Sequence, residues 1–145
     1  MAINRMDHVG IVVDDLAGAI EFFTELGLEP QGQTFVEGSW VDRIVGLDGV
    51  QVDAAMMRTP DGHSSLELVK FHAPPIEGAD APAPANTRGL RHLAFVVDDI
   101  DDAVSRLQAR GGRLVGEIEN YRDMFRLCYL RGPEGIIVEL AQRIG

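Results

Sequence analysis

The chain has 145 residues, of which 46% are hydrophobic and 25% are charged, and its formal net charge is −10. This size and composition are typical of a folded globular domain and argue against a disordered chain. Nucleic acid and anionic membrane surfaces require a clustered basic face, so the acidic balance argues against both as partners.

The cysteine content and the first residues indicate the compartment. Cys128 is the only cysteine, so the chain cannot form an internal disulfide bond. The apolar run Val9–Val13 is followed by two aspartates and is too short for a signal peptide or a membrane span. We therefore expect a soluble, cytoplasmic protein.

The first half of the chain begins with a predicted strand, Asp7–Val13, that is rich in β-branched residues. Two aspartates then provide a helix N-cap, and apolar residues at helical spacing predict an amphipathic helix that ends at Gly27. Three further strands are expected in this half, although Trp40–Leu47 fits a short helical turn as well as a strand.

The second half repeats the first at an offset of 84 residues. His8-Val-Gly-Ile-Val-Val-Asp-Asp reappears as His92-Leu-Ala-Phe-Val-Val-Asp-Asp, so we expect a strand at Arg91–Val97 and a helix that ends at Gly111. Three more strands follow, with a turn at residues 131–135 between the last two: Arg113–Glu117, Phe125–Arg131 and Ile136–Ala141.

A segment rich in Pro and Ala separates the two halves and is typical of an extended linker. We therefore predict an α+β fold built from two tandem βαβββ modules. The first module covers residues 1–72 and the second covers residues 89–145, with the linker at residues 73–88.

Each predicted module places one histidine and one glutamate on the same face of its strands. Because side chains alternate along a strand, His8 and His92 point away from the apolar residues expected under the helices. Glu67 and Glu139 each stand between two aliphatic residues, where an unsatisfied carboxylate costs several kcal/mol. When the halves face each other, two imidazoles and two carboxylates form a set that suits Ni, Co, Zn, Mn or Fe(II).

Four short segments are similar to one family in their order and placement. They are His8-Val-Gly-Ile-Val-Val, Leu66-Glu67-Leu68, Arg91-His92-Leu-Ala-Phe-Val-Val-Asp-Asp and Pro133-Glu-Gly-Ile-Ile-Val-Glu139-Leu. The pattern resembles the vicinal oxygen chelate superfamily, also called the glyoxalase/bleomycin resistance/dioxygenase family, over essentially the whole chain. The resemblance implies two βαβββ modules side by side, forming a cup-shaped mixed sheet around one divalent metal ion.

The resemblance also implies a ligand set and a reaction. In glyoxalase I-like members the first and last strands of each module supply the ligands, which here are His8, Glu67, His92 and Glu139. This implies a metal-dependent lyase or isomerase, similar to lactoylglutathione lyase, that transfers a proton on a small metal-chelating substrate. The metal would act as a Lewis acid, with Glu139 or Glu67 as the catalytic base. Family members usually pair, so we expect a homodimer.

Two departures separate this chain from the glutathione-using enzymes. Their arginine four residues after the first ligand is Val12 here, and their asparagine four residues after the first-half glutamate is Phe71. Fixed donors of this kind hold a glutathione carboxylate. The motifs therefore do not favour glutathione as the substrate.

Two other activities in the family remain alternatives. Methylmalonyl-CoA epimerase has similar motifs, but its separate catalytic glutamate aligns near Leu47, beside Asp48. Extradiol dioxygenases normally bind Fe(II) through two histidines and one glutamate, a pattern that Glu67 disfavours.

A third alternative is a protein without enzyme activity. Metal-free family members sequester antibiotics, which requires an apolar and aromatic site. The residues available for its walls are Trp40, Met56, Met57, Tyr121, Phe125 and Tyr129. The intact ligand set favours the metal-dependent enzyme, because a protein that only binds a drug has no need of it.

Overall fold

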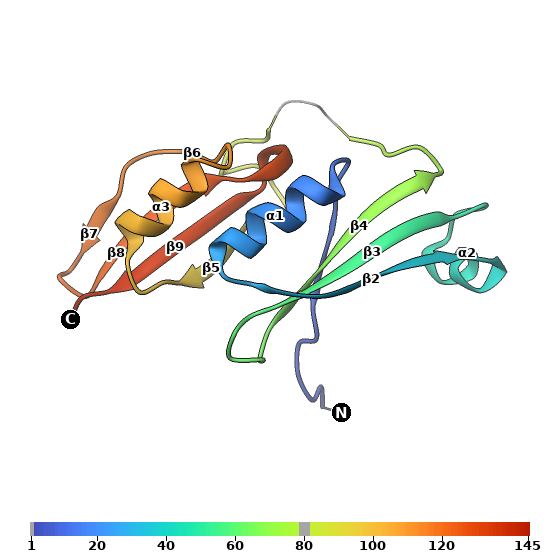
Figure 1. Cartoon of the computed structure of the whole chain (residues 1–145), viewed down its shortest axis with the longest axis horizontal. Coiled ribbons are helices and arrows are strands. Elements are labelled where there is room, and N and C mark those ends of the chain that lie inside the picture. The colour runs from blue at the N-terminus through green and yellow to red at the C-terminus, as the bar shows by residue number, and fades with distance from the viewer. Residues whose placement is uncertain (1, 79–81) are drawn as a thin grey trace. The chain divides into compact units, whose positions relative to one another are not determined.

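The computed structural model describes residues 2–78 and 82–145. The chain divides into two compact units, residues 1–78 and 79–145. Each unit combines one β-sheet with helices, and the chain has three α-helices within the described residues. This is the α+β fold predicted from the sequence (Figure 1).

The first unit is a four-stranded sheet in the order β1-β4-β3-β2. Strands β1 and β4 run parallel, and the other neighbours run antiparallel. The elements of this unit are β1 (Val9–Val12), α1 (Leu16–Leu26), β2 (Glu29–Glu37), α2 (Ser39–Val45), β3 (Gln51–Arg58) and β4 (Ser65–Ala73). The unit therefore has the predicted βαβββ order, with α2 added between the second and third strands.

Helix α1 covers one face of this sheet and forms its core. The side chain of Asp15 accepts a hydrogen bond from the Gly18 amide at 2.9 Å and caps the helix N-terminus. Gly27 ends the helix with a φ of 121°, a conformation that glycine adopts without strain. The helix packs against β3 and β4, where Leu66 and Leu68 are buried.

Helix α2 packs on the opposite face of the same sheet. Val41 on α2 is buried together with Val50 and Val52. Val69 and Phe71 pack against this cluster from β4, and these two alternate with the buried residues under α1. The segment Trp40–Leu47, which fits a strand or a helix in the sequence, is therefore helical as far as Val45, because α2 packs on the second apolar face of the sheet.

The second unit repeats the arrangement in the order β5-β9-β8-β6, with β7 also paired to β8. Strand β5 runs parallel to β9, as β1 runs to β4. Helix α3 packs against β6, β8 and β9 (Figure 1). The elements are β5 (His92–Val96), α3 (Ile100–Gln108), β6 (Arg113–Leu114), β7 (Glu119–Tyr121), β8 (Phe125–Arg131), η1 (Pro133–Gly135) and β9 (Ile137–Arg143).

Two local predictions for the second unit were wrong. The strand expected at Arg113–Glu117 is only the two residues of β6, and a separate short strand, β7, begins at Glu119. The pairing with β8 changes register between Leu114 and Glu119, and Gly116 weakens a continuous strand. Helix α3 ends at Gln108 and not at Gly111. The chain instead continues in a turn, in which the Gly112 amide donates to the Leu107 carbonyl at 2.8 Å.

The predicted linker lies partly outside the described residues, at 79–81. The described residues 74–78 and 82–91 contain no helix or strand. The guanidinium of Arg131 donates to the Ala83 carbonyl at 2.7 Å, so the second part of this segment is attached to the second unit. Nowhere in the described parts of the chain is a helix long and apolar enough to cross a membrane.

Candidate functional site

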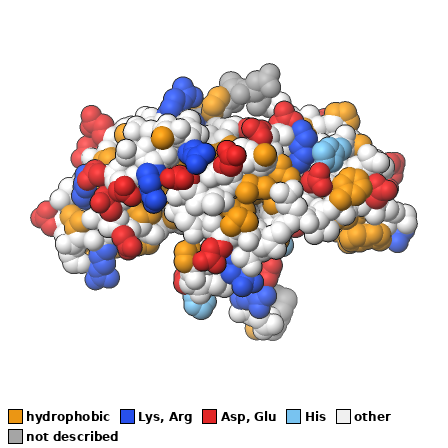
Figure 2. Space-filling view, viewed as in Figure 1, with side chains coloured by type: hydrophobic (Ala, Val, Ile, Leu, Met, Phe, Trp, Pro, Cys, Tyr) orange, Lys and Arg blue, Asp and Glu red, His pale blue; other side chains and the backbone are white. Residues whose placement is uncertain are grey.

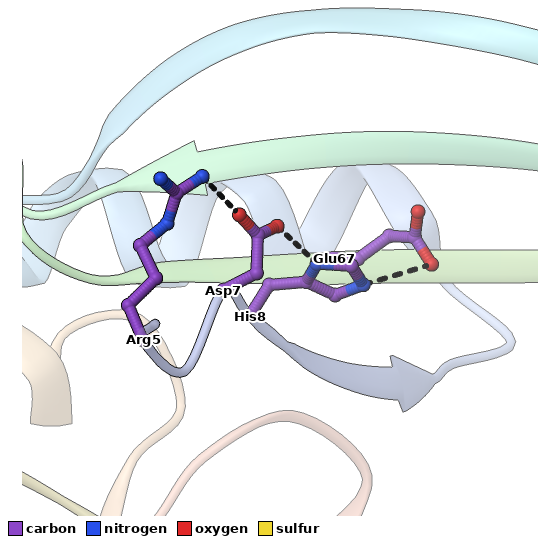
Figure 3. A network of polar contacts seen from close by, with 4 residues as sticks. All are labelled: Arg5, Asp7, His8 and Glu67. Atoms are coloured by element: carbon purple, nitrogen blue, oxygen red, sulfur yellow. Dashed lines mark hydrogen bonds and ion pairs between the residues drawn. The ribbon is translucent and has the colours of Figure 1, made fainter. Parts of the chain in front are cut away.

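The first histidine and glutamate lie close together in the first unit. The parallel register sets Gly10 on β1 beside Glu67 on β4. The neighbours of Glu67 along the strand, Leu66 and Leu68, are buried under α1, so its carboxylate occupies the other face. His8 immediately precedes β1, and its Nε2 lies 4.0 Å from Glu67 Oε1 (Figure 3). The side chains of His8 and Glu67 are 36% and 35% exposed, so both are accessible to a ligand.

A second carboxylate holds the other nitrogen of the His8 ring. Asp7 Oδ2 lies 2.8 Å from His8 Nδ1, and Arg5 donates to Asp7 Oδ1 at 2.8 Å. Figure 3 shows the four side chains in one chain of contacts, from Arg5 through Asp7 and His8 to Glu67. The hydrogen bond with His8, and then that with Arg5, lowers the pKa of Asp7 below its ordinary value.

The second unit contains an equivalent pair. Ala94 on β5 lies beside Glu139 on β9, as Gly10 lies beside Glu67. His92 Nε2 is 3.5 Å from Glu139 Oε1, and these side chains are 38% and 23% exposed. The antiparallel β8–β9 register places Tyr129 opposite Glu139. Its hydroxyl is 3.3 Å from His92 Nδ1, and the two rings lie 4.9 Å apart between centroids.

An open cleft of about 430 Å³ lies beside this second pair. Glu139 and Tyr129 line it, together with a second carboxylate, Glu117. Its remaining lining residues are Val115, Gly116, Leu127 and Cys128. Burial raises the pKa of the Cys128 thiol, as expected for a structural cysteine rather than a nucleophile.

Both units therefore contain the same arrangement of side chains: the Nε2 of an imidazole faces a carboxylate, and its Nδ1 contacts another side chain. This is the usual environment of a metal-binding histidine, whose second nitrogen is held by a carboxylate, a carbonyl or a similar group. Among the described residues, neither unit by itself gathers three or more His, Cys, Asp or Glu side chains able to hold a metal ion. Each pair fits part of a divalent metal's ligand set.

The other residues considered from the sequence are scattered. Met57 is buried in the core under α1, whereas Met56 lies beside Glu67 in the β3–β4 register. Trp40 is half exposed on α2, and Tyr121 is half exposed on β7. His72, which does not belong to either pair, is in β4 and its Nε2 lies 2.7 Å from Asp53 Oδ2.

Sequence reasoning did not identify what holds the two histidine rings. At the 84-residue offset, the residue that corresponds to Asp7 is Arg91, so the repeat does not point to Asp7. The sequence indicates Tyr129 only as a residue available for the wall of an apolar site. Its pairing with Glu139 follows from the β8–β9 hairpin. Counting residues in both directions from the turn at residues 133–135 predicts this pairing.

The family is decided by comparison with known proteins. Residues 7–129 match the model of the glyoxalase/bleomycin resistance protein/dioxygenase superfamily. The chain belongs to this superfamily. Members commonly bind small molecules, often with a divalent metal ion, and commonly form dimers. The superfamily fold predicted from the four short segments is thereby confirmed.

Individual relatives include enzymes. The chain is 32% identical over 142 residues to a 2-epi-5-epi-valiolone epimerase from Actinomyces sp., covering 92% of this chain and 76% of the relative. A glyoxalase family protein from Bacillus cereus, known as a crystal structure, is 48% identical with a TM-score of 0.96, covering 100% of this chain and 97% of that one.

A more distant structure has the same fold. A fosfomycin resistance protein from Listeria monocytogenes, crystallised as a mutant with Mn(II) and dihydroxypropylphosphonic acid, is 15% identical with a TM-score of 0.63. The match covers 99% of this chain and 92% of the Listeria chain.

Proposed function

We propose that this protein is a glyoxalase-like, metal-dependent lyase or isomerase that transfers a proton on a small, oxygen-chelating substrate. The observation that supports this most is the repeated pair of His8 with Glu67 and His92 with Glu139. In both pairs Nε2 faces the carboxylate at 3.5 to 4.0 Å. A protein that only sequesters a drug has no chemical need for two such pairs.

The proposal makes both pairs ligands of the same divalent ion. When bound, the metal would polarise adjacent substrate oxygens as a Lewis acid. Imidazole and carboxylate suit Ni, Co, Zn, Mn or Fe(II), and these residue types alone do not select among them. A further part of the proposal is that the active species is a homodimer, which sedimentation equilibrium tests.

Glu139 is the preferred catalytic base, with Glu67 as the second candidate. Glu139 lines the open cleft in the second unit, so its carboxylate is accessible to a small molecule there. In the proposed step, Glu139 takes a proton from a substrate carbon next to a carbonyl and returns it to the same or the adjacent carbon. The 32% identity to an epimerase supports this class of reaction, because epimerisation beside a carbonyl removes and returns one proton.

The charge of the cleft favours a neutral or cationic substrate. Glu117 and Glu139 line it, and the chain as a whole has a net charge of −10. On the face shown in Figure 2, acidic side chains are spread widely and lie among basic ones. An anionic substrate would meet two carboxylates in the cleft, which costs free energy unless the metal offsets their charge.

The decisive experiment is the metal content of protein purified without a metal-binding tag. We expect about one divalent ion per chain, and its loss in both His8→Ala and Glu139→Ala. His63→Ala is the matched control, since His63 is exposed in a turn, and it should retain the ion. If His8→Ala and Glu139→Ala each retain the ion, the two pairs do not share it.

A protein that contains no ion, and takes up none of Ni, Co, Zn, Mn or Fe(II), contradicts the proposal. The metal-free sequestering activity would then be the better explanation. The next measurement would be drug binding by the same purified chain.

A further inference from the structure

The two histidines of the proposed site differ in what holds their second ring nitrogen. His8 Nδ1 contacts a carboxylate, Asp7, at 2.8 Å. His92 Nδ1 contacts a hydroxyl, that of Tyr129, at 3.3 Å. The difference determines which nitrogen of each neutral ring carries the proton.

An ionised carboxylate only accepts hydrogen bonds, so the contact with Asp7 requires a proton on His8 Nδ1. Arg5 donates to the other oxygen of Asp7 at 2.8 Å, which favours the ionised carboxylate and holds its orientation. The neutral His8 ring then has its lone pair on Nε2. That nitrogen faces Glu67 (Figure 3).

A hydroxyl both donates and accepts, so Tyr129 allows either tautomer of His92. When Tyr129 donates to Nδ1, the proton of His92 is on Nε2, and this nitrogen cannot bind a metal without losing it. When Tyr129 accepts from Nδ1, Nε2 is free. The Glu139 carboxylate, 3.5 Å from Nε2, only accepts hydrogen bonds and therefore favours the proton on Nε2 while no metal is bound.

We propose that Asp7 is a positioning residue that presets His8 with its Nε2 lone pair free, whereas His92 adopts that tautomer only when a metal ion binds. The consequence for metal affinity rests on the proposed function, but the tautomer of His8 does not. Asp7 acts through His8 and is not itself a ligand.

A second His–Asp contact provides an internal reference. His72 lies 2.7 Å from Asp53 through Nε2 instead of Nδ1. By the same argument, the neutral His72 ring carries its proton on Nε2. The chain therefore holds two histidines that carboxylates set to opposite tautomers, and a spectrum that resolves both contains its own standard.

The test is ¹⁵N–¹H NMR of the histidine rings in the full-length, metal-free protein at a pH of about 8.5. The four histidines are assigned through single His→Gln variants. We expect the Nδ1–H form for His8 and the Nε2–H form for His72 and His92. A wild-type His8 in the Nε2–H form overturns the proposal.

Variants at Asp7 separate the effect of its acceptor oxygen from the effect of its negative charge. Asp7→Ala removes the acceptor, so His8 should lose its Nδ1–H preference while His72 keeps its signal. Asp7→Asn retains an acceptor oxygen without the charge and should keep much of the preference. Tyr129→Phe should change the His92 signal alone. An unchanged His8 signal in folded Asp7→Ala overturns the proposal.

Cobalt titration adds a readout that depends on the metal site. We expect Asp7→Ala to weaken Co²⁺ binding by about 10- to 100-fold, Asp7→Asn to weaken it less, and Glu37→Gln, an exposed charge control on β2, to leave it unchanged. Equal affinity in wild type and Asp7→Ala overturns the positioning role. If the wild type binds no Co²⁺ but shows the expected tautomers, the proposed function fails and Asp7 still sets the His8 tautomer.

Discussion

Gly10 lies directly beside Glu67 in the parallel β1–β4 pair, and a Cβ built on Gly10 would meet nothing within 4 Å. The equivalent residue beside Glu139 is Ala94. A small residue next to each glutamate leaves the face around the carboxylate open. The two units share this feature although their sequences differ at the position.

This relationship predicts that a small side chain at position 10 leaves metal binding intact and that a large one reduces it. Gly10→Ala should leave metal binding unchanged and raise the free energy of unfolding by up to about 1 kcal/mol, because glycine within a strand is entropically unfavourable. Gly10→Leu should fill the space beside Glu67 and reduce metal uptake without unfolding the protein. Urea denaturation and metal analysis check both. Full metal content in Gly10→Leu would show that this face is not used.

Replacing the proposed base should separate turnover from binding. With saturating metal, Glu139→Gln is expected to lower kcat by about 10²- to 10⁴-fold, because a positioned base contributes that much, and to change substrate affinity far less. Steady-state kinetics and substrate titration on a substrate found by screening measure the two effects. Glu67→Gln is the matched variant in the other unit. A larger loss of kcat in Glu67→Gln would assign the base to Glu67, and equal losses of turnover and affinity would contradict either assignment.

The reactivity of Cys128 should report its burial. The side chain is 4% exposed, and burial, followed by the nearby charge of Glu139, raises the pKa of its thiol. We expect the native protein to react with a disulfide reagent at least about ten times more slowly than the urea-unfolded chain. One thiol per chain should react after unfolding. Fast labelling of the native protein would show that the strand around Cys128 opens readily.

The ion pair between α3 and β8 should make stability depend on acid pH. Arg126 donates to both oxygens of Asp101, at 2.7 and 3.0 Å, and this lowers the pKa of Asp101 below 3.8. A carboxyl whose pKa is lower in the folded state stabilises the fold above its ordinary pKa and loses that contribution as the pH falls through the lowered value.

Asp101→Asn should therefore lower the urea midpoint slightly near neutral pH, since the pair is exposed and weak. The difference in urea midpoint between this variant and the wild type should disappear as the pH falls well below 3.8. Asp102→Asn is the control on the same helix turn, because Asp102 pairs with Arg106 within α3 and not with the sheet. A gap that persists in acid would mean that Asp101 acts through packing or helix capping.

The strands and helices were largely predictable from the sequence because their signals are local. Alternation along β4 and β9 placed Glu67 and Glu139 opposite the buried aliphatic residues. The aspartates before α1 and α3 and the glycine after α1 marked helix ends. The end of α3 was mispredicted, because Gly111 lies in a turn after the helix and not at its cap.

The sequence by itself therefore determined the βαβββ order of the first unit, most of the strand order of the second, and the face on which each His–Glu pair lies. Only the tertiary structure decided what contacts the second nitrogen of each histidine. Asp7 reaches His8 from the neighbouring position, whereas Tyr129 reaches His92 through the pairing of β8 with β9. The repeat places Arg91 where Asp7 stands, and a hydrogen bond depends on the position of an acceptor atom, which a pattern of residue types does not specify.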